Sequence, residues 1–389
     1  MQLDSIQAAL REQDMDAWLF YDHHYRDPIG YRILGLPEDA LVTRRWYYLI
    51  PAEGEPRKLV HRIESGRLDA LPGTKGEYSS WQELEAGLAA MVAPYRRVAM
   101  QYSPGNAIMY VSLVDAGTVE ALRSLGTEIV SSADLVSRFE AVLSDEQIAS
   151  HYEAQMALDE ILAEGFREMG RRVRAGRVTE YDIVQWLQEA MRRADLVWEH
   201  GTNVSVNENS ADSHYHPEFM TAKEIRSGDF VLIDIWARKN RPGTCYYDIT
   251  WTGVVDREPS EREQQVFEIV KNARDAAIKT VKEAFASNTP IAGWQADDAA
   301  REVIAKAGFG EFFTHRTGHN IGNALHGNGA HLDNLETHDE RLILPNTCFS
   351  VEPGIYLTGE FGVRSEVNMI ATPGKAAVTG RVQQELVRI

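Results

Sequence analysis

Residues 230–234 read FVLID, and residues 246–251 read YYDITW. Both runs have the apolar, β-branched and aromatic composition of strands, and an Arg-Pro-Gly turn lies in the loop between them. Each run carries one aspartate, Asp234 or Asp248, and the two are 14 positions apart. A hairpin between the runs would bring the two carboxylates together. Because a carboxylate in a buried strand requires a partner or a metal ion, this pair marks a candidate site.

A second pair of acids repeats this arrangement. Glu352 follows the apolar run CFSV at residues 348–351, and Glu366 lies in GVRSEV at residues 362–367. These glutamates are also 14 positions apart, with glycines between them that allow the chain to turn. Any one of these acids alone is most simply a solvated surface residue. Four carboxylates with one histidine, however, form the ligand set of two divalent cations that share a bridging hydroxide.

The histidine that completes this set lies in HRTGHNIG at residues 315–322. Glycines near His319 allow the backbone to approach a site closely, and imidazole is a common ligand of transition metals. His326 lies seven positions after His319, and we expect one of them on metal and the other on substrate. Farther upstream, His214 lies in a polar, loop-like stretch, where a histidine alone is most simply solvated.

Residues 1–143 are predicted to form a small α/β domain of their own. A capping box of Ser80 and Glu83 predicts a helix over residues 80–93. Strands are predicted for the apolar runs at residues 17–20, 46–50, 98–100 and 128–130. No cluster of chemically active residues stands out in this domain, so we expect it to shape the mouth of the site and to form oligomer contacts.

Residues 144–389 show an internal duplication in layout. Two helices and a group of strands are followed by two more helices and a second group of strands. Helices are predicted to open at Ser144, Thr179, Ser260 and Trp294. Strands are predicted from about residue 203 to 255 and again up to about residue 370. Each half supplies one acidic pair, so the metal ions are expected between the halves of an α+β domain.

Composition limits the classes of function. The 389 residues are enough for two domains, and 44% hydrophobic with 25% charged residues is typical of a soluble globular protein. A net charge of −18 argues against binding to nucleic acid or to anionic membranes. No apolar run approaches the ~20 residues of a membrane span, and the N-terminal residues show no signal-peptide pattern.

Cysteine content is low. Cys245 and Cys348 are the only two in the chain, which is too few for a disulfide framework and fits a reducing compartment. Each lies in an apolar run beside a proposed ligand strand, so we interpret both as small buried hydrophobic residues and not as metal ligands. A cytoplasmic location is the simplest expectation.

Taken in order, these motifs resemble those of the pita-bread metallopeptidases, which include methionine aminopeptidase, aminopeptidase P and prolidase. The motifs are the two aspartate strands, residues 315–322 with His326, SVEPGIY at residues 350–356 and GVRSE at residues 362–366. The resemblance covers about residues 145–380. It implies an α+β pita-bread domain over residues 144–389 with a pseudo-twofold duplication, after a creatinase-type N-terminal α/β domain.

The resemblance also implies the metal ligands. Asp234 would hold one ion, Asp248 and Glu366 would bridge both, and His319 and Glu352 would hold the other. Glu352 would also act as the acid/base catalyst. Ligands of this kind favour Mn²⁺, with Co²⁺ or Zn²⁺ as alternatives.

Further positions match residues that act on substrate in this family. His214 and His326 match positions that contact the substrate and stabilise the tetrahedral intermediate. His315, Tyr356 and Arg364 match positions that line the substrate pocket or support the ligands.

Three residues depart from the family pattern. Trp251 stands where arginine is usual, Asn320 replaces a common glycine, and Gly327 follows His326 where glutamate is frequent. None of them removes a ligand, so they bear on substrate preference and on the residues behind the ligands.

The expected activity is hydrolysis of Xaa-Pro bonds by a dinuclear-metal exopeptidase, most simply an Xaa-Pro dipeptidase (prolidase) that uses a metal-bridging hydroxide. Methionine aminopeptidases generally lack an N-terminal domain of this size. Small peptides are the expected partners, with neither nucleic acid nor membrane, and a homodimer is expected from the family.

Four alternatives remain at this point. Aminopeptidase P would cleave longer peptides, and a lyase or amidinohydrolase on the same fold would keep similar ligands. Creatinase-like hydrolases and non-catalytic binding modules have lost the ligands that this chain keeps. Metal content separates the last two from a peptidase, and substrate profiling separates the others.

Overall fold

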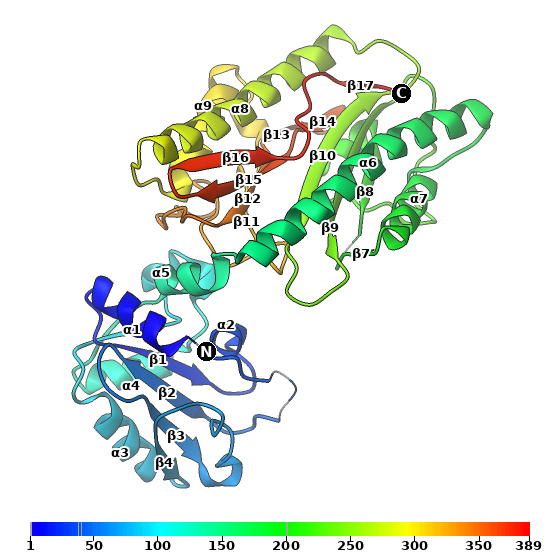
Figure 1. The fold of residues 1–389 in the computed structure, drawn as a ribbon. Helices are drawn as coiled ribbons and strands as arrows, with labels where there is room; N and C mark the ends of the chain where they lie inside the picture. Colours follow the sequence, from blue (N-terminus) through cyan, green and yellow to red (C-terminus); the bar gives the residue numbers. More distant parts are fainter. Residues whose placement is uncertain (1, 38, 40, 200) are drawn as a thin grey trace. The chain divides into compact units, whose positions relative to one another are not determined.

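The computed structural model describes residues 2–37, 39, 41–199 and 201–389. The chain forms two compact units, Met1–Glu140 and Ala141–Ile389, and each has its own hydrophobic core (Figure 1). In the part of the chain that is described, no helix is both long and apolar enough to span a membrane.

The N-terminal unit is built on a six-stranded sheet with the order β4-β3-β2-β1-β5-β6. Its strands are β1 (Ala17–Asp22), β2 (Trp46–Pro51), β3 (Arg57–His61), β4 (Thr74–Tyr78), β5 (Arg97–Met100) and β6 (Glu128–Ser131). Its helices are α1 (Leu3–Glu12), α2 (Pro28–Leu34), α3 (Trp81–Val92), α4 (Ala116–Ser124) and α5 (Ala133–Val136). Strand β2 is antiparallel to both of its neighbours, while β3 and β4 are parallel, as are β1, β5 and β6.

The four predicted strands of this unit are confirmed, as is the helix capped by Ser80 and Glu83. Strands β3 and β4 were not predicted. Strand β3 reads RKLVH and has only two apolar residues in a row, and β4 reads TKGEY and exposes all but its last residue. An edge strand of this kind lacks the apolar run that marks a buried strand.

The C-terminal unit shows the predicted repeat of two helices followed by strands. Its helices are α6 (Asp145–Ala175), α7 (Glu180–Arg193), α8 (Glu261–Ala286) and α9 (Gly293–Lys306). The side chains of Ser144, Thr179 and Ser260 accept the backbone N–H three residues later, and each forms a capping box. The helices begin at these polar residues because their side chains accept from N–H groups that have no partner within the helix.

The strands of the C-terminal unit form two main sheets and a separate hairpin. The first half holds β7 (Leu196–Val197), β8 (Asn203–Val206), β9 (Phe230–Lys239) and β10 (Tyr247–Val254). The second half holds β11 (Asn320–Ile321), β12 (Cys348–Val351), β13 (Gly354–Leu357), β14 (Phe361–Arg364), β15 (Val367–Thr372), β16 (Lys375–Thr379) and β17 (Val387–Arg388). Helix α6 packs on β9 and β10, and α8 packs along β16 of the sheet β11-β12-β15-β16 (Figure 1).

Two details differ from the sequence prediction. Strand β9 is longer than the run at residues 230–234 and continues beyond Asp234 to Lys239. Strands β16 and β17 extend the sheets beyond the last predicted strand at residue 370. Strand β17 is short and β16 is partly polar, and the pairing of both depends on tertiary contacts that a local sequence pattern does not contain.

Candidate metal centre

The hairpin of β9 and β10 brings the two aspartates together, as predicted. In its antiparallel register Asp234 pairs with Thr250, and Asp248 pairs with Trp236. Because Asp248 and Thr250 are two residues apart on one strand, their side chains lie on the same face as that of Asp234. The two carboxylates are therefore diagonal neighbours across the hairpin.

The two glutamates meet in a different way from the simple hairpin suggested by their spacing. Strand β12 pairs with β15 up to Val351 and Val367, and the β13–β14 hairpin fills the sequence between these strands. Glu352 and Glu366 follow and precede the paired residues directly, so both lie at the same end of the β12–β15 ladder. The Glu366 N–H donates to the Thr250 carbonyl at 3.1 Å, which joins the two halves of the unit.

His319 lies between the two acidic pairs. Its Nε2 is 3.3 Å from Glu352 Oε1 and 3.6 Å from Asp248 Oδ2. A Cβ on the preceding Gly318 would stand 2.0 Å from the Ser350 carbonyl oxygen, so only glycine allows the backbone to pass this close. The His319 N–H donates to Ser350 Oγ at 2.9 Å, which fixes the segment against β12.

Two hydroxyl groups orient the carboxylates, and neither was predicted from the sequence. Thr250 Oγ1 lies 2.7 Å from Glu366 Oε2 and 3.0 Å from Asp234 Oδ1. Ser350 Oγ donates to Glu352 Oε1 at 2.9 Å. Each hydroxyl residue lies two positions from an acid of the site, on the same strand face, and this spacing was the available signal.

Arg364 links the acids to a polar chain. Its Nη2 contacts Asp234 Oδ2, and its Nε donates to Thr250 Oγ1 at 3.0 Å. Its Nη1 lies 3.3 Å from the Tyr356 hydroxyl, which in turn is 2.6 Å from His315 Nε2. Burial lowers the pKa of His315 to about 4, so this imidazole is neutral at pH 7. Its Nδ1 lies 2.7 Å from the Arg316 carbonyl oxygen and donates there, so Nε2 accepts from the Tyr356 hydroxyl.

All five predicted metal ligands line one cavity of about 370 Å³. His214, His326 and Arg364 line it as well, whereas His315 and Tyr356 lie behind Arg364 and do not form part of its lining. The remaining lining residues were not predicted from the sequence; they are Asn203, Ser213, His216, Trp236 and Leu325. The His326 ring stands edge-on to that of His319 at 4.2 Å between centroids.

The four acids of this cavity are deeply buried, and their pKa values are shifted from the usual values of carboxyl groups. Burial raises the pKa of Asp234 to about 7 and also raises the pKa of Asp248 and Glu366. The pKa of Glu352 is lowered instead, because the charges of His319 and Arg364 outweigh its burial. Such a cluster of facing carboxylates is costly unless cations neutralise it.

Two buried oxygens indicate where cations fit. Asp248 Oδ1 and Glu366 Oε1 have no hydrogen-bond partner. Asp248, His319 and Glu366 also offer ligand atoms that all lie within 4.8 Å of one another. Oxygen ligands with one imidazole suit a hard-to-borderline divalent metal ion, so the residues present fit such an ion.

The departures at positions 320 and 327 are physically linked. A Cβ on Gly327 would lie 2.2 Å from Asn320 Oδ1, so the asparagine side chain occupies the space beside the glycine. Asn320 is buried, donates to the Cys348 carbonyl at 2.9 Å and accepts from the Gly329 N–H at 3.0 Å. Trp251 instead packs against the hydrophobic core between α6, α7 and the first sheet, away from the cavity.

A second group of possible ligands, His151, Cys245 and Cys348, is also buried. The His151 ring is already engaged, since Nδ1 lies 2.6 Å from the Tyr246 carbonyl oxygen and Nε2 lies 2.9 Å from Thr379 Oγ1. Both thiols lie in an apolar cluster, in agreement with the prediction that they are small buried residues.

Comparison with known proteins places this geometry in context. The profile described as metallopeptidase family M24 matches residues 155–373, more than half of the chain. The "Probable dipeptidase PepE" of Mycobacterium bovis is 28% identical over 348 residues, which cover 87% of this chain and 84% of that protein. The Xaa-Pro dipeptidase of Pyrococcus furiosus is 31% identical over 164 residues, covering 42% of this chain and 43% of that protein.

Solved structures show the same architecture. The dipeptidase PepE from Mycobacterium ulcerans has a TM-score of 0.71 at 22% identity and covers 100% of this chain and 97% of its own. The prolidase from Pyrococcus horikoshii OT3 has a TM-score of 0.63 at 22% identity and covers 99% of each chain. These likenesses confirm the predicted α+β pita-bread fold with its smaller N-terminal α/β part.

Proposed function

Because the chain belongs to metallopeptidase family M24, and is therefore a metal-dependent peptidase, we propose that it is a dinuclear-metal exopeptidase that hydrolyses Xaa-Pro dipeptides. The observation that carries this proposal is the single cavity lined by Asp234, Asp248, His319, Glu352 and Glu366. Relatives named Xaa-Pro dipeptidase support the choice of substrate.

The five ligand residues would hold two divalent cations. Asp234 and Asp248 would bind one, His319 and Glu352 the other, and the unpartnered oxygens of Asp248 and Glu366 support their role as bridges. Such cations supply a nucleophilic water at neutral pH and polarise the scissile carbonyl. Thr250 and Ser350 hold the carboxylates in place, which keeps the ligand set preorganised.

Glu352 is the proposed proton carrier. Its Oε1 already accepts from Ser350 and faces His319, while Oε2 is 3.9 Å from Arg364 Nε. Through Oε2 the residue would take the proton of the attacking water and pass it to the leaving nitrogen.

The histidines of the cavity would act on the substrate. The neighbouring His319 and burial lower the pKa of His326 to about 3, so its imidazole stays neutral and donates an N–H to the developing oxyanion. His214 lies on the cavity wall in an exposed loop, where it can reach the peptide group. Trp236 and Leu325 provide the apolar wall against which substrate side chains pack.

Other features of the molecule follow from the same proposal. Carboxylate-rich ligands favour Mn²⁺, with Co²⁺ or Zn²⁺ as alternatives. Two free, buried thiols suit a reducing cytoplasm. A homodimer is proposed from the family resemblance.

The test is hydrolysis of the Xaa-Pro bond, followed as release of the N-terminal amino acid, in Xaa-Pro dipeptides and in longer Xaa-Pro peptides. Chelator-stripped protein is assayed with and without added Mn²⁺. Manganese-dependent cleavage restricted to dipeptides is expected. Cleavage of longer peptides would assign aminopeptidase P activity instead. No cleavage by protein that carries two metal ions would contradict the proposed activity and favour a lyase or amidinohydrolase on this fold.

A further inference from the structure

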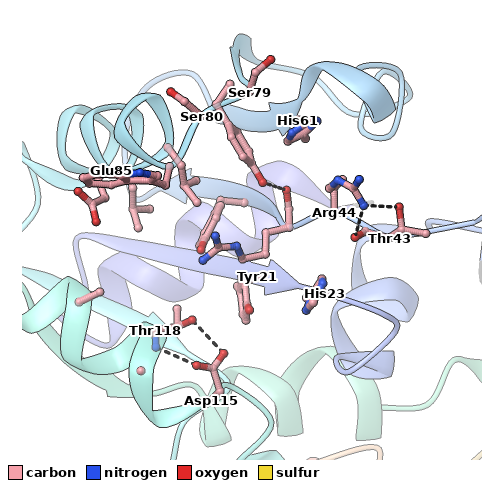
Figure 2. A pocket seen from close by; sticks show the side chains of 18 of the residues that line it. Tyr21, His23, Thr43, Arg44, His61, Ser79, Ser80, Glu85, Asp115 and Thr118 are labelled. Carbon is pink, nitrogen blue, oxygen red and sulfur yellow. Dashed lines mark hydrogen bonds between the residues drawn. The ribbon is translucent and has the colours of Figure 1, made fainter.

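The N-terminal unit contains a separate cavity of about 720 Å³ that the peptidase chemistry does not use (Figure 2). It lies at one edge of the six-stranded sheet. Because β2 is antiparallel to both β1 and β3, the carboxyl ends of β1, β3 and β4 share this edge. Tyr21, His61 and Tyr78 line the cavity from the ends of these three strands. This is the edge at which α/β sheets generally bind ligands.

Two helices form the walls of this cavity. Helix α3 packs against β3 and β4, and α4 packs against β6, so the face of β1 and β2 lies between them. Figure 2 shows Glu85 on one helix, Asp115 and Thr118 at the start of the other, and Tyr21 between them. The volume is within the roughly 300–1,000 Å³ range of small-molecule sites.

The cavity gathers positive charge in a chain whose net charge is −18. Arg26, Arg44 and Arg45 line it, and none of the three forms an ion pair with a carboxylate among the residues described. Of the two acids present, Asp115 already accepts from the Thr118 N–H at 3.0 Å and from Thr118 Oγ1 at 2.9 Å. Arg44 has Glu64 nearby, which accepts the Arg44 backbone N–H at 3.3 Å, and its Nη1 contacts Thr43 Oγ1 at 3.1 Å. Guanidinium groups outside carboxylate ion pairs suit an anionic ligand, and their planar fork matches a phosphate.

Arg45 is central to this group. Burial raises the pKa of Tyr21, Tyr47 and Tyr78, and the charge of Arg45 acts against that rise at all three hydroxyls. The Tyr78 hydroxyl donates to the Arg45 carbonyl at 2.8 Å and so fixes the backbone at this point. His23 lies in the same field, because burial, His24, Arg26 and Arg45 together lower its pKa. The charge of Arg45 therefore acts on three tyrosine hydroxyls of this unit.

An exposed aromatic ring completes the cavity. Trp81, the first residue of α3, lines the cavity and is 63% exposed. An exposed indole loses contact with water at little cost when a planar group stacks on it, and stacking on aromatic rings stabilises bound bases by about 1–3 kcal/mol.

We propose that this cavity binds a small organic phosphate that carries a planar ring, the class of the nucleoside monophosphates. Arg44 and Arg45 hold the phosphate, and Trp81 packs against the ring. All of its lining residues belong to the N-terminal unit.

The test is isothermal titration calorimetry of the full chain with adenosine monophosphate, adenosine and inorganic phosphate. Adenosine monophosphate is expected to bind at least about tenfold more tightly than adenosine or inorganic phosphate, because it alone makes both the arginine contact and the Trp81 contact. Arg45→Ala should weaken the binding of adenosine monophosphate and of phosphate by about tenfold or more. Arg44→Ala is a second variant that removes part of the same phosphate contact. Trp81→Ala should weaken the binding of the nucleotide and leave the affinity for phosphate unchanged.

Arg96→Ala is the matched control, since Arg96 is an exposed arginine of the same unit that does not line the cavity. The affinity of this variant for adenosine monophosphate should equal that of the parent protein. An unchanged thermal unfolding midpoint shows that each variant is folded. No binding of the nucleotide, or equal loss with Arg96→Ala and Arg45→Ala, would overturn the site. Phosphate that binds as tightly as the nucleotide would overturn the ring contact.

Discussion

Asp248 and Glu366 each keep one buried carboxylate oxygen without a hydrogen-bond partner. Native proteins rarely tolerate such atoms, because an unsatisfied buried acceptor loses its hydration without compensation. Both residues were identified from sequence by their strands and spacing. Thr250 and Ser350 were not, because a hydroxyl residue in a strand is common and only the observed contacts show which oxygens it serves.

Loss of a proposed metal ligand should lower metal content and abolish turnover. Asp248→Ala and Glu352→Ala are each expected to reduce kcat/KM by at least about a hundredfold and to lower the metal content per chain. Elemental analysis and a dipeptide assay measure the two effects. Glu189→Ala, an exposed acid on α7, is the control and should change neither. Full metal content in both cavity variants would show that these residues are not ligands.

His326 should behave differently, because it faces the cavity without being one of the proposed ligands. His326→Ala is expected to lower kcat by about a hundredfold, the usual effect of removing one oxyanion donor, while metal content stays that of the parent. Loss of metal from this variant would instead assign His326 to the ligand set.

At the scale of the elements, the site depends on how closely the His319 segment approaches β12. Helix starts were predictable because a capping box is a local signal, seen at Ser144 and Ser260. That Glu352 and Glu366 lie close together was predicted, but the strands that bring them together were not. The two glutamates are as far apart in sequence as the two aspartates, yet they flank the β12–β15 ladder and do not lie on one hairpin. Register between distant strands depends on tertiary packing that no local pattern contains.

Gly318→Ala tests this close approach. The added Cβ would stand 2.0 Å from the Ser350 carbonyl oxygen, so the backbone must shift. We expect a loss of about 1–3 kcal/mol in the free energy of unfolding, measured with urea, together with weaker metal binding as His319 moves. Gly322→Ala is the control, because a Cβ there meets no atom within 4 Å. Equal stability of the two variants would contradict the role assigned to Gly318.

At the scale of the whole molecule, the metal centre joins two halves of the C-terminal unit. Asp234 and Asp248 come from the first sheet, and Glu352 and Glu366 flank strands of the second half. Cations held between the halves would therefore act as a cross-link that exists only in the folded state. The duplication in layout was visible in the sequence, because both acidic pairs follow two helices.

Removal of metal should thus destabilise the protein. Chelation is expected to lower the thermal unfolding midpoint, and Mn²⁺ at about a thousandfold its dissociation constant should restore about 4 kcal/mol per independent site. Differential scanning calorimetry measures the shift. Asp248→Ala, which lacks a bridging ligand, should show a smaller response to Mn²⁺. An equal response in the parent and the variant would place the stabilising ions elsewhere.

The most direct test of the metal centre is a crystal structure of the manganese-loaded protein with an anomalous difference map. Two manganese peaks are expected in one cavity, with Asp248 and Glu366 in contact with both. The cavity is the one lined by Asp234, Asp248, His319, Glu352 and Glu366. A single peak, an empty cavity, or a peak beside His151, Cys245 and Cys348 would contradict this expectation.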